Sequence, residues 1–189
     1  MVHVQVNPEQ AIRRIKLMAA SHIKAMFICA EPGINTELVA YAIHATSSRH
    51  AYPFVAYHAV TRPEALVDQH LFGRANSPAP GCCRMADGGT LYIENIEALP
   101  LFCQAKILDA VEDGVYRRQG AIRQTRVDLH VVATSSRSVE EWRRPGQIHT
   151  GLYYRLRDSH IVLPPLREWS SEMLEFFFSR QRRLNSRKR

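Results

Sequence analysis

AMFICAEPGINTELVAYAIH, residues 25–44, combines three kinds of sequence in one unit. Residues 25–30 form a short, continuous apolar run, residues 31–33 (EPG) have the composition of a turn, and residues 37–44 are mostly apolar. A short apolar run of this length is typical of a buried strand, and the segment after the turn is typical of a helix. We therefore predict a strand, a loop and a helix here.

The same unit recurs downstream, and further strand-like runs follow it. The predicted strands are PFVAYHA (53–59), TLYIENI (90–96), VDLHVVAT (127–134) and HIVL (160–163), and the predicted helices between them cover 63–72 and 100–111. Five apolar strands that alternate with helices indicate a parallel sheet covered on both faces, which is the three-layer αβα class.

Three other segments complete the predicted domain. A helix is expected from Pro8 to about Ser21, because proline is favoured in the first helical turn. The polar stretch 114–126 contains Gly120, which favours a small hairpin. A last helix is expected from Arg167, with an apolar side made of Trp169, Met173, Leu174, Phe177 and Phe178.

Length and composition indicate one soluble domain. A chain of 189 residues is long enough for one core and short for two, so we expect a single domain over 1–178 and a basic tail over 179–189. No stretch approaches the roughly 20 apolar residues of a membrane span. The start, MVHVQVNPEQ, has no signal-peptide pattern, so a cytoplasmic location is expected.

The four cysteines indicate neither disulfides nor a zinc site. Cys29, Cys103 and the adjacent pair Cys82 and Cys83 lack paired CxxC spacing. Reduced thiols are the cytosolic norm, so we expect buried apolar cysteines, with Cys82 and Cys83 beside a loop.

The net charge of +7 is concentrated at the end of the chain. The last ten residues contain no acid and six basic residues, namely Arg180, Arg182, Arg183, Arg187, Lys188 and Arg189; without them the charge is 7 − 6 = +1. Such a run is either a solvated end or a non-specific contact for nucleic-acid phosphate, and we favour the solvated end. No sequence-specific DNA binding is expected.

The loop after the first strand has the position of a phosphate-binding loop but not its chemistry. Helix N-termini that follow a strand attract anions, and a working phosphate loop adds glycines, a lysine and a Ser or Thr for Mg²⁺. Residues 30–37 (AEPGINTE) contain one glycine, Gly33, and no lysine. The loop alone therefore predicts scaffolding rather than nucleotide binding.

Seven segments extend the pattern beyond this loop. They are LVAYAIH (38–44), PFVA (53–56), PEALVDQHLFG (63–73), ADGGTLYIENIEALPL (86–101), QAKIL (104–108), GLYYRL (151–156) and LPPLRE (163–168). In this order they closely resemble the sigma-54 interaction domain, the AAA+ ATPase module of bacterial enhancer-binding proteins, over about residues 10–178. The resemblance implies the strand order 5-1-4-3-2 and a ring-forming ATPase that remodels sigma-54 RNA polymerase.

The departures from the family pattern fall on its working parts. Where the family has GESGTGKE, Ala30, Asn35 and Thr36 replace the first glycine, the last glycine and the lysine. A Thr36 hydroxyl cannot supply the missing positive charge. If nucleotide binds weakly, the resemblance assigns it to what remains of the loop: Glu31, Gly33, Asn35, Thr36 and Glu37.

The acidic motif also lacks a residue that the family's chemistry needs. The family's LFLDEI is Leu91–Ile96 (LYIENI) here, so Glu94 stands at the Mg²⁺-binding aspartate and Asn95 at the water-polarising glutamate. The amide of Asn95 cannot accept a proton, so hydrolysis loses its base. Glu94 is either a Mg²⁺ ligand or a solvated carboxylate at the end of a strand.

The resemblance locates four further positions. His58 replaces an asparagine that couples the glutamate to the γ-phosphate, and Ser136 replaces the sensor asparagine. Of the two arginines that reach into the neighbouring subunit, Arg155 remains and His149 replaces the other. Arg155 is either this trans-acting group or a partner of the local acid Asp158.

Two family elements are expected to be missing. The long insertion with GAFTGA that contacts sigma-54 is reduced to residues 74–85, where Pro78 and Pro80 favour a short bridging turn. The sequence stops within the first helix of the family's helical lid, so we expect a domain without the lid.

These observations predict a pseudo-ATPase that regulates transcription by contact with a protein, either an intact AAA+ activator subunit or another part of the transcription machinery. No cofactor is required in this interpretation. The alternatives are a weak ATP or ADP binder or slow ATPase that uses Mg²⁺, and a remnant without function.

Overall fold

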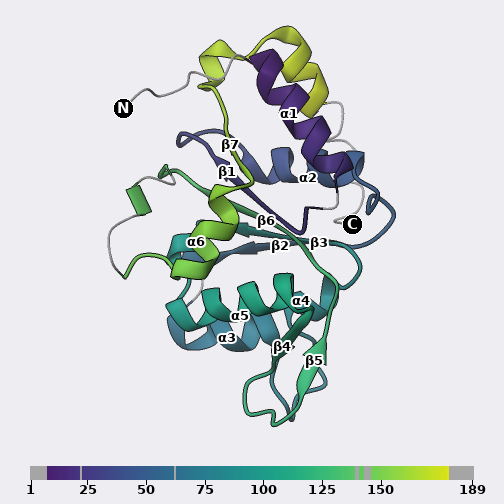
Figure 1. The fold of residues 1–189 in the computed structure, drawn as a ribbon, viewed down its shortest axis with the longest axis vertical. Helices are drawn as coiled ribbons and strands as arrows, with labels where there is room; N and C mark the ends of the chain where they lie inside the picture. Colours follow the sequence, from purple (N-terminus) through teal and green to yellow (C-terminus); the bar gives the residue numbers. More distant parts are fainter. Residues whose placement is uncertain (1–7, 22, 62, 139–140, 143–145, 179–189) are drawn as a thin grey trace.

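The computed structural model describes residues 8–178 except 22, 62, 139–140 and 143–145. The basic segment 179–189 lies outside the described residues. The described chain folds into an α/β domain of three layers, as predicted (Figure 1).

A five-stranded parallel sheet forms the middle layer. Its strands are β1 (Ala25–Cys29), β2 (Phe54–His58), β3 (Thr90–Glu94), β6 (His130–Ser135) and β7 (His160–Val162), in the spatial order β2-β3-β6-β1-β7. All four neighbouring pairs are parallel. This is the predicted order 5-1-4-3-2.

Helices cover both faces of this sheet. They are α1 (Pro8–Ala20), α2 (Thr36–Thr46), α3 (Glu64–Phe72), α4 (Cys82–Met85), α5 (Leu101–Glu112), α6 (Thr150–Arg157) and a helix over residues 171–178, with 3-10 turns η1 (Ala59–Thr61), η2 (Ile96–Ala98) and η4 (Leu166–Glu168). Figure 1 shows α1 and α2 on one side of the sheet and α3 and α5 on the other.

The alternation of side chains along the strands divides the apolar residues into two cores. Phe27 points into the core shared with α3, α5 and α6, whereas Met26 and Ile28 point into the core shared with α1, α2 and the 171–178 helix. All five residues of β1 are buried, because the strand has neighbours on both edges and helices on both faces. This double burial explains why β1 is a continuous apolar run rather than an alternating one.

Three predicted details change. The last helix begins at residue 171 rather than at Arg167, because the 3-10 turn η4 occupies Leu166–Glu168. β6 begins at His130 rather than at Val127, because the Val127 N–H donates to the carbonyl of Gly114 (2.8 Å) and closes the hairpin instead. In the last helix Phe178 is 49% exposed and Phe176 is buried, so the predicted apolar side was wrong at Phe178.

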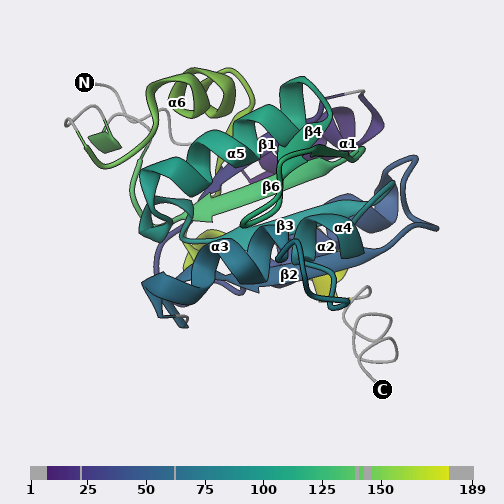
Figure 2. The ribbon, with the colours of Figure 1, turned by 90° about the horizontal axis from the view of Figure 1, so that it is seen from below.

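The predicted hairpin exists and is attached to the loop that follows α3. The hairpin strands β4 (Val115–Arg117) and β5 (Gln124–Arg126) pair antiparallel, and Gly120 turns between them with a positive φ of 72°. Backbone hydrogen bonds of 2.9 Å join Gln119 to Gly73 and Ala75. Figures 1 and 2 show the hairpin projecting away from the sheet on the side of α3, α4 and α5.

The loop over residues 73–81 closes on itself where it begins and ends. A Cβ on Gly81 would lie 2.4 Å from the backbone nitrogen of Gly73, an approach that only glycine permits. The predicted short bridging turn with Pro78 and Pro80 is thus fixed by the close approach of Gly73 and Gly81. The hydrogen bonds to Gln119 attach it to the hairpin.

The cysteines are reduced, and Cys29, Cys83 and Cys103 are buried. Burial raises the pKa of Cys103 to about 12, so its thiol stays protonated. Within the described residues, no helix combines the length and apolar character needed to cross a bilayer.

Acid is expected to destabilise this fold through His130. Burial, followed by repulsion from Arg49 and His44, lowers the pKa of His130 from 6.5 to about 4. Because the folded value is the lower one, the unfolded chain binds the proton first, and stability present above pH 6.5 is lost as the pH falls toward 4. The free energy of unfolding should fall by about 3 kcal/mol over this range.

Urea unfolding at neutral pH and near pH 4.5 measures this loss. His130→Gln should flatten the pH dependence, whereas His160→Gln, which alters a less buried histidine, should leave it unchanged. An equally steep loss in His130→Gln would assign the effect to other groups.

Candidate functional site

The parallel register brings the predicted site residues to one edge of the sheet. His58 lies beside Glu94 in the β2–β3 pair, Glu94 lies beside Thr134 in the β3–β6 pair, and Cys29 lies beside Ser135 in the β6–β1 pair. The carboxyl ends of parallel strands are where α/β proteins bind ligands. The loop between β1 and α2 lies at this same edge, because it begins where β1 ends.

The loop presents an exposed glycine but caps its own helix. Gly33 has a φ of +100°, and a Cβ there would meet no atom within 4 Å. The Asn35 side chain accepts a hydrogen bond from the Leu38 N–H (3.0 Å) and so caps α2. That N–H is one of the donors that a helix N-terminus would otherwise offer to an anion.

Glu31 is directed to the C-terminal part of the domain. Its carboxylate accepts from the Leu166 N–H (3.3 Å) and pairs with Arg167 (3.6 Å). Glu31 therefore joins the loop to η4.

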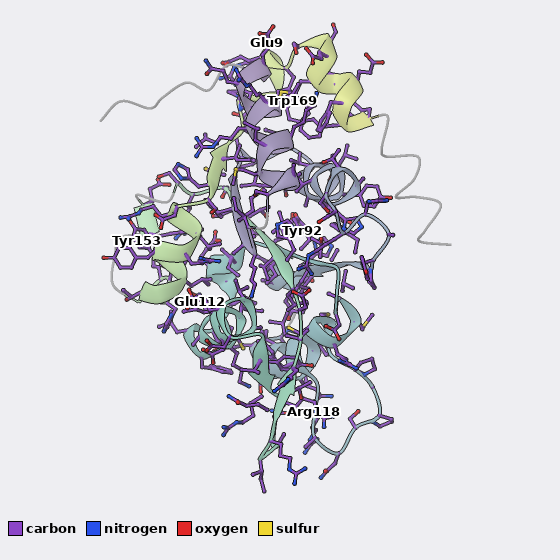
Figure 3. All side chains as sticks on the ribbon, turned by 45° about the vertical axis from the view of Figure 1, so that its right-hand side comes forward. Glu9, Tyr92, Glu112, Arg118, Tyr153 and Trp169 are labelled. Atoms are coloured by element: carbon purple, nitrogen blue, oxygen red, sulfur yellow. The ribbon has the colours of Figure 1, made fainter. Side chains whose placement is uncertain are left out.

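Thr36, which stands where the family has lysine, forms an internal hydrogen bond. Its hydroxyl lies 2.7 Å from the Tyr92 hydroxyl, and both residues are buried. Burial raises the pKa of Tyr92 to about 12, so the phenol stays protonated and neutral. Figure 3 shows Tyr92 in the interior of the domain.

The carboxylate of Glu94 is bound to a histidine of the same domain. The Nδ1 of His58 lies 2.7 Å from Glu94 Oε2, and its Nε2 lies 3.7 Å from Glu37 Oε2. The two carboxylates come from β3 and from the first turn of α2, so His58 bridges the strand edge and the helix. Among the described residues no group of three or more His, Cys, Asp or Glu has the geometry of a metal site.

Asn95 adopts a conformation that suits asparagine. With φ 54° and ψ 62° it is left-handed, and within the described ranges it is the one residue other than glycine with positive φ. Asparagine tolerates this region better than most L-residues. Asn95 starts η2, and its carbonyl accepts from Ala98 (2.9 Å).

The predicted sensor residue is exposed, and its neighbour makes the bonds. Ser136 follows the end of β6 and faces solvent. The buried Ser135 donates to Glu97 Oε1 (2.6 Å) and accepts from the Arg137 N–H (2.9 Å). The sequence prediction missed Tyr92, Ser135 and Glu97, because these residues are revealed by contacts between strands and not by spacing.

Arg155 lies within α6 and is partly exposed. Asp158, its proposed local partner, pairs with Arg157 instead (3.5 Å), and Arg155 has no ion pair within the part of the chain that the structure describes. That alternative was therefore wrong.

His149 lies directly before α6, and its backbone N–H forms a hydrogen bond with α5. The His149 N–H donates to Gln104 Oε1 (2.7 Å), and the Gln104 amide donates to the Leu99 carbonyl (2.8 Å). The fully buried Gln104 thus joins α5 to the start of α6.

Comparisons with known proteins agree with this architecture. The family model described as "Sigma-54 interaction domain" matches residues 1–162. The chain is 34% identical over 170 residues to the nitric oxide reductase transcription regulator NorR2 of Cupriavidus necator, covering 86% of this chain and 32% of that protein. It is 32% identical over 177 residues to the luminescence regulatory protein LuxO of Vibrio campbellii, covering 90% and 39%. The chain therefore spans about a third of one relative and about two fifths of the other.

Solved structures show the same fold. NtrX from Brucella abortus in complex with ATP has a TM-score of 0.75 and 29% identity, covering 87% of this chain and 38% of that one. The P-loop NTPase domain of an E. coli "Sigma-54 transport activator" has a TM-score of 0.60 and 20% identity, covering 84% and 94%, which supports the fold alone.

The Thr36–Tyr92 hydrogen bond makes a testable contribution to stability. Tyr92→Phe leaves the buried Thr36 hydroxyl without this partner and should lower the free energy of unfolding by about 1–3 kcal/mol. Urea unfolding measures the change, with Tyr154→Phe on an exposed tyrosine as the matched control. Equal stability of Tyr92→Phe and the wild type would show that the bond stabilises nothing.

Proposed function

Because the chain belongs to the sigma-54 interaction domain family, we propose that it is a pseudo-ATPase that regulates transcription by protein contact, without hydrolysing ATP. The observation that carries the proposal is that the polar side chains in the cleft are hydrogen-bonded within the protein. Thr36 bonds to Tyr92, Glu94 bonds to His58, and Asn35 caps α2. In a working site the equivalent groups would be directed at phosphate and Mg²⁺.

The loss of hydrolysis is supported by two independent positions. The phosphate loop has no lysine to stabilise charge that develops on the transferred phosphoryl group, and Thr36 in its place faces the core. Asn95 has no basic atom to accept a proton from water. Either change alone removes a large part of the rate enhancement.

Nucleotide binding without hydrolysis is the second candidate. NtrX, of similar fold, was solved with ATP and with ADP, at TM-scores of 0.75 and 0.77. Gly33 is exposed at the corresponding edge of the sheet here and leaves room for a backbone contact. Mg²⁺ would have to displace His58 from Glu94.

Remodelling of sigma-54 is outside the proposal. The family's insertion for that contact corresponds to residues 74–85 here, and the loop 73–81 is held at Gly81 and along Gln119. The proposed partner is therefore an intact AAA+ activator subunit or another component of the transcription machinery.

Phosphate release and calorimetry test the catalytic part. With Mg²⁺ and millimolar ATP we expect no phosphate release above buffer, and Asn95→Glu alone should not restore turnover because the lysine is still missing. An intact sigma-54 activator domain serves as the positive control. Turnover in the wild type that Glu94→Gln abolishes would instead establish a slow ATPase.

The same ATP titration separates the two candidates. A heat of binding, or a rise in the melting temperature with ATP or ADP, would establish nucleotide binding without hydrolysis. No heat and no thermal shift would exclude the second candidate.

Association with an intact ring-forming activator from the same cell tests the regulatory part. We expect a complex at micromolar concentration. Arg155→Gln should weaken binding to the ATP-loaded partner about tenfold, because one charge-assisted hydrogen bond to phosphate is lost. Arg157→Gln, on the same helix but paired with Asp158, should bind like the wild type. Absence of a complex would contradict the regulatory proposal.

A further inference from the structure

A cavity lies apart from the edge of the sheet where the strands have their carboxyl ends. It occupies 460 Å³ between the hairpin and the loop 73–81, and its lining includes Tyr116, Arg118, Arg126 and Arg84. Figure 3 shows Arg118 at the hairpin end of the molecule, well apart from Tyr92 in the interior. We call this cavity the hairpin pocket.

The walls of the hairpin pocket are held in place. Gln119 is hydrogen-bonded to Gly73 and Ala75, which fixes the hairpin against the loop. The loop supplies Pro78 and Pro80 to the lining, and the proline rings restrict its backbone. The pocket is therefore a built cavity between two joined segments.

Two residues that line this pocket each have a buried donor atom without an acceptor. Tyr116 is 2% exposed, and its hydroxyl forms no hydrogen bond in the described chain; the same is true of Arg118 Nε. Burial raises the pKa of Tyr116 to about 12, so the hydroxyl keeps its proton for donation. Buried polar atoms without partners are rare in folded proteins, and a ligand is one cause.

The charged side chains that line the pocket are all arginines. Within the described residues neither Arg118 nor Arg126 has an ion-pair partner, whereas Arg84 is bound to Asp87 (2.7 Å). Guanidinium groups have no acceptor, and each can present a planar pair of donors. The ligand that satisfies this set must accept several hydrogen bonds and carry negative charge.

We propose that the hairpin pocket binds a phosphate group. Phosphate offers several acceptor oxygens around one centre, so Tyr116 and the arginines can bind it together. A cavity of 460 Å³ falls in the size range of small-molecule sites. The phosphate comes either from a phosphorylated small molecule or from a nucleic-acid backbone that passes the hairpin.

Calorimetric titration of the whole chain with pyrophosphate tests the site. Tyr116→Phe removes only the hydroxyl and should weaken binding at least about fivefold, and Arg118→Gln at least about tenfold. Arg123→Gln is the matched control, because Arg123 is an exposed arginine of the same hairpin outside the lining, and it should bind within about twofold of the wild type. Tyr116→Phe should keep the melting temperature of the free protein, because the lost hydroxyl has no partner.

A labelled short single-stranded DNA distinguishes the two sources of phosphate. DNA binding that pyrophosphate displaces and that Tyr116→Phe weakens supports the nucleic-acid source, and pyrophosphate binding without DNA binding supports the small molecule. The proposal is overturned if pyrophosphate does not bind at millimolar concentration. It is overturned as well if Tyr116→Phe and Arg118→Gln bind pyrophosphate like the wild type, because the anion would then bind at another site, such as the phosphate loop. It is also overturned if Arg123→Gln loses as much affinity as Arg118→Gln, or if an oligoglutamate peptide binds the pocket more tightly than pyrophosphate.

Discussion

The burial of β1 on both of its faces and both of its edges is the constraint on which the rest of the domain depends. Five consecutive buried residues can be accommodated only if strands pair on each side and helices cover each face. Parallel pairing with β6 and β7 then aligns the carboxyl ends of the strands at one edge. The loop 30–35, Glu94 and Ser135 lie together for that reason, although they are far apart in the sequence.

Several polar groups at this edge bind one another. Buried or half-buried polar groups are costly without partners, so these side chains need hydrogen bonds within the protein. Tyr92 supplies one for Thr36, and His58 supplies one for Glu94. The side chains at these two positions are therefore satisfied within the fold.

The hairpin pocket, in contrast, is lined by residues with buried donors that lack acceptors. The loop 73–81 and the hairpin are joined by backbone hydrogen bonds at Gln119, yet the Tyr116 hydroxyl and Arg118 Nε beside them lack acceptors in the described chain. The proposed phosphate site rests on these two donors and on the arginines that line the same pocket.

The sequence by itself determined the layers, the parallel sheet, the hairpin at Gly120 and the losses at Thr36 and Asn95, because continuous apolar runs, turn residues and side-chain chemistry are local properties. Only the tertiary structure decided that Thr36 bonds to Tyr92, that His58 bridges Glu94 and Glu37, and that Arg157 rather than Arg155 pairs with Asp158. These contacts depend on strand register and on helix orientation, which no short stretch of the chain contains. The exposure of Phe178 and the late start of β6 were likewise decided by packing and by a single backbone hydrogen bond between distant residues.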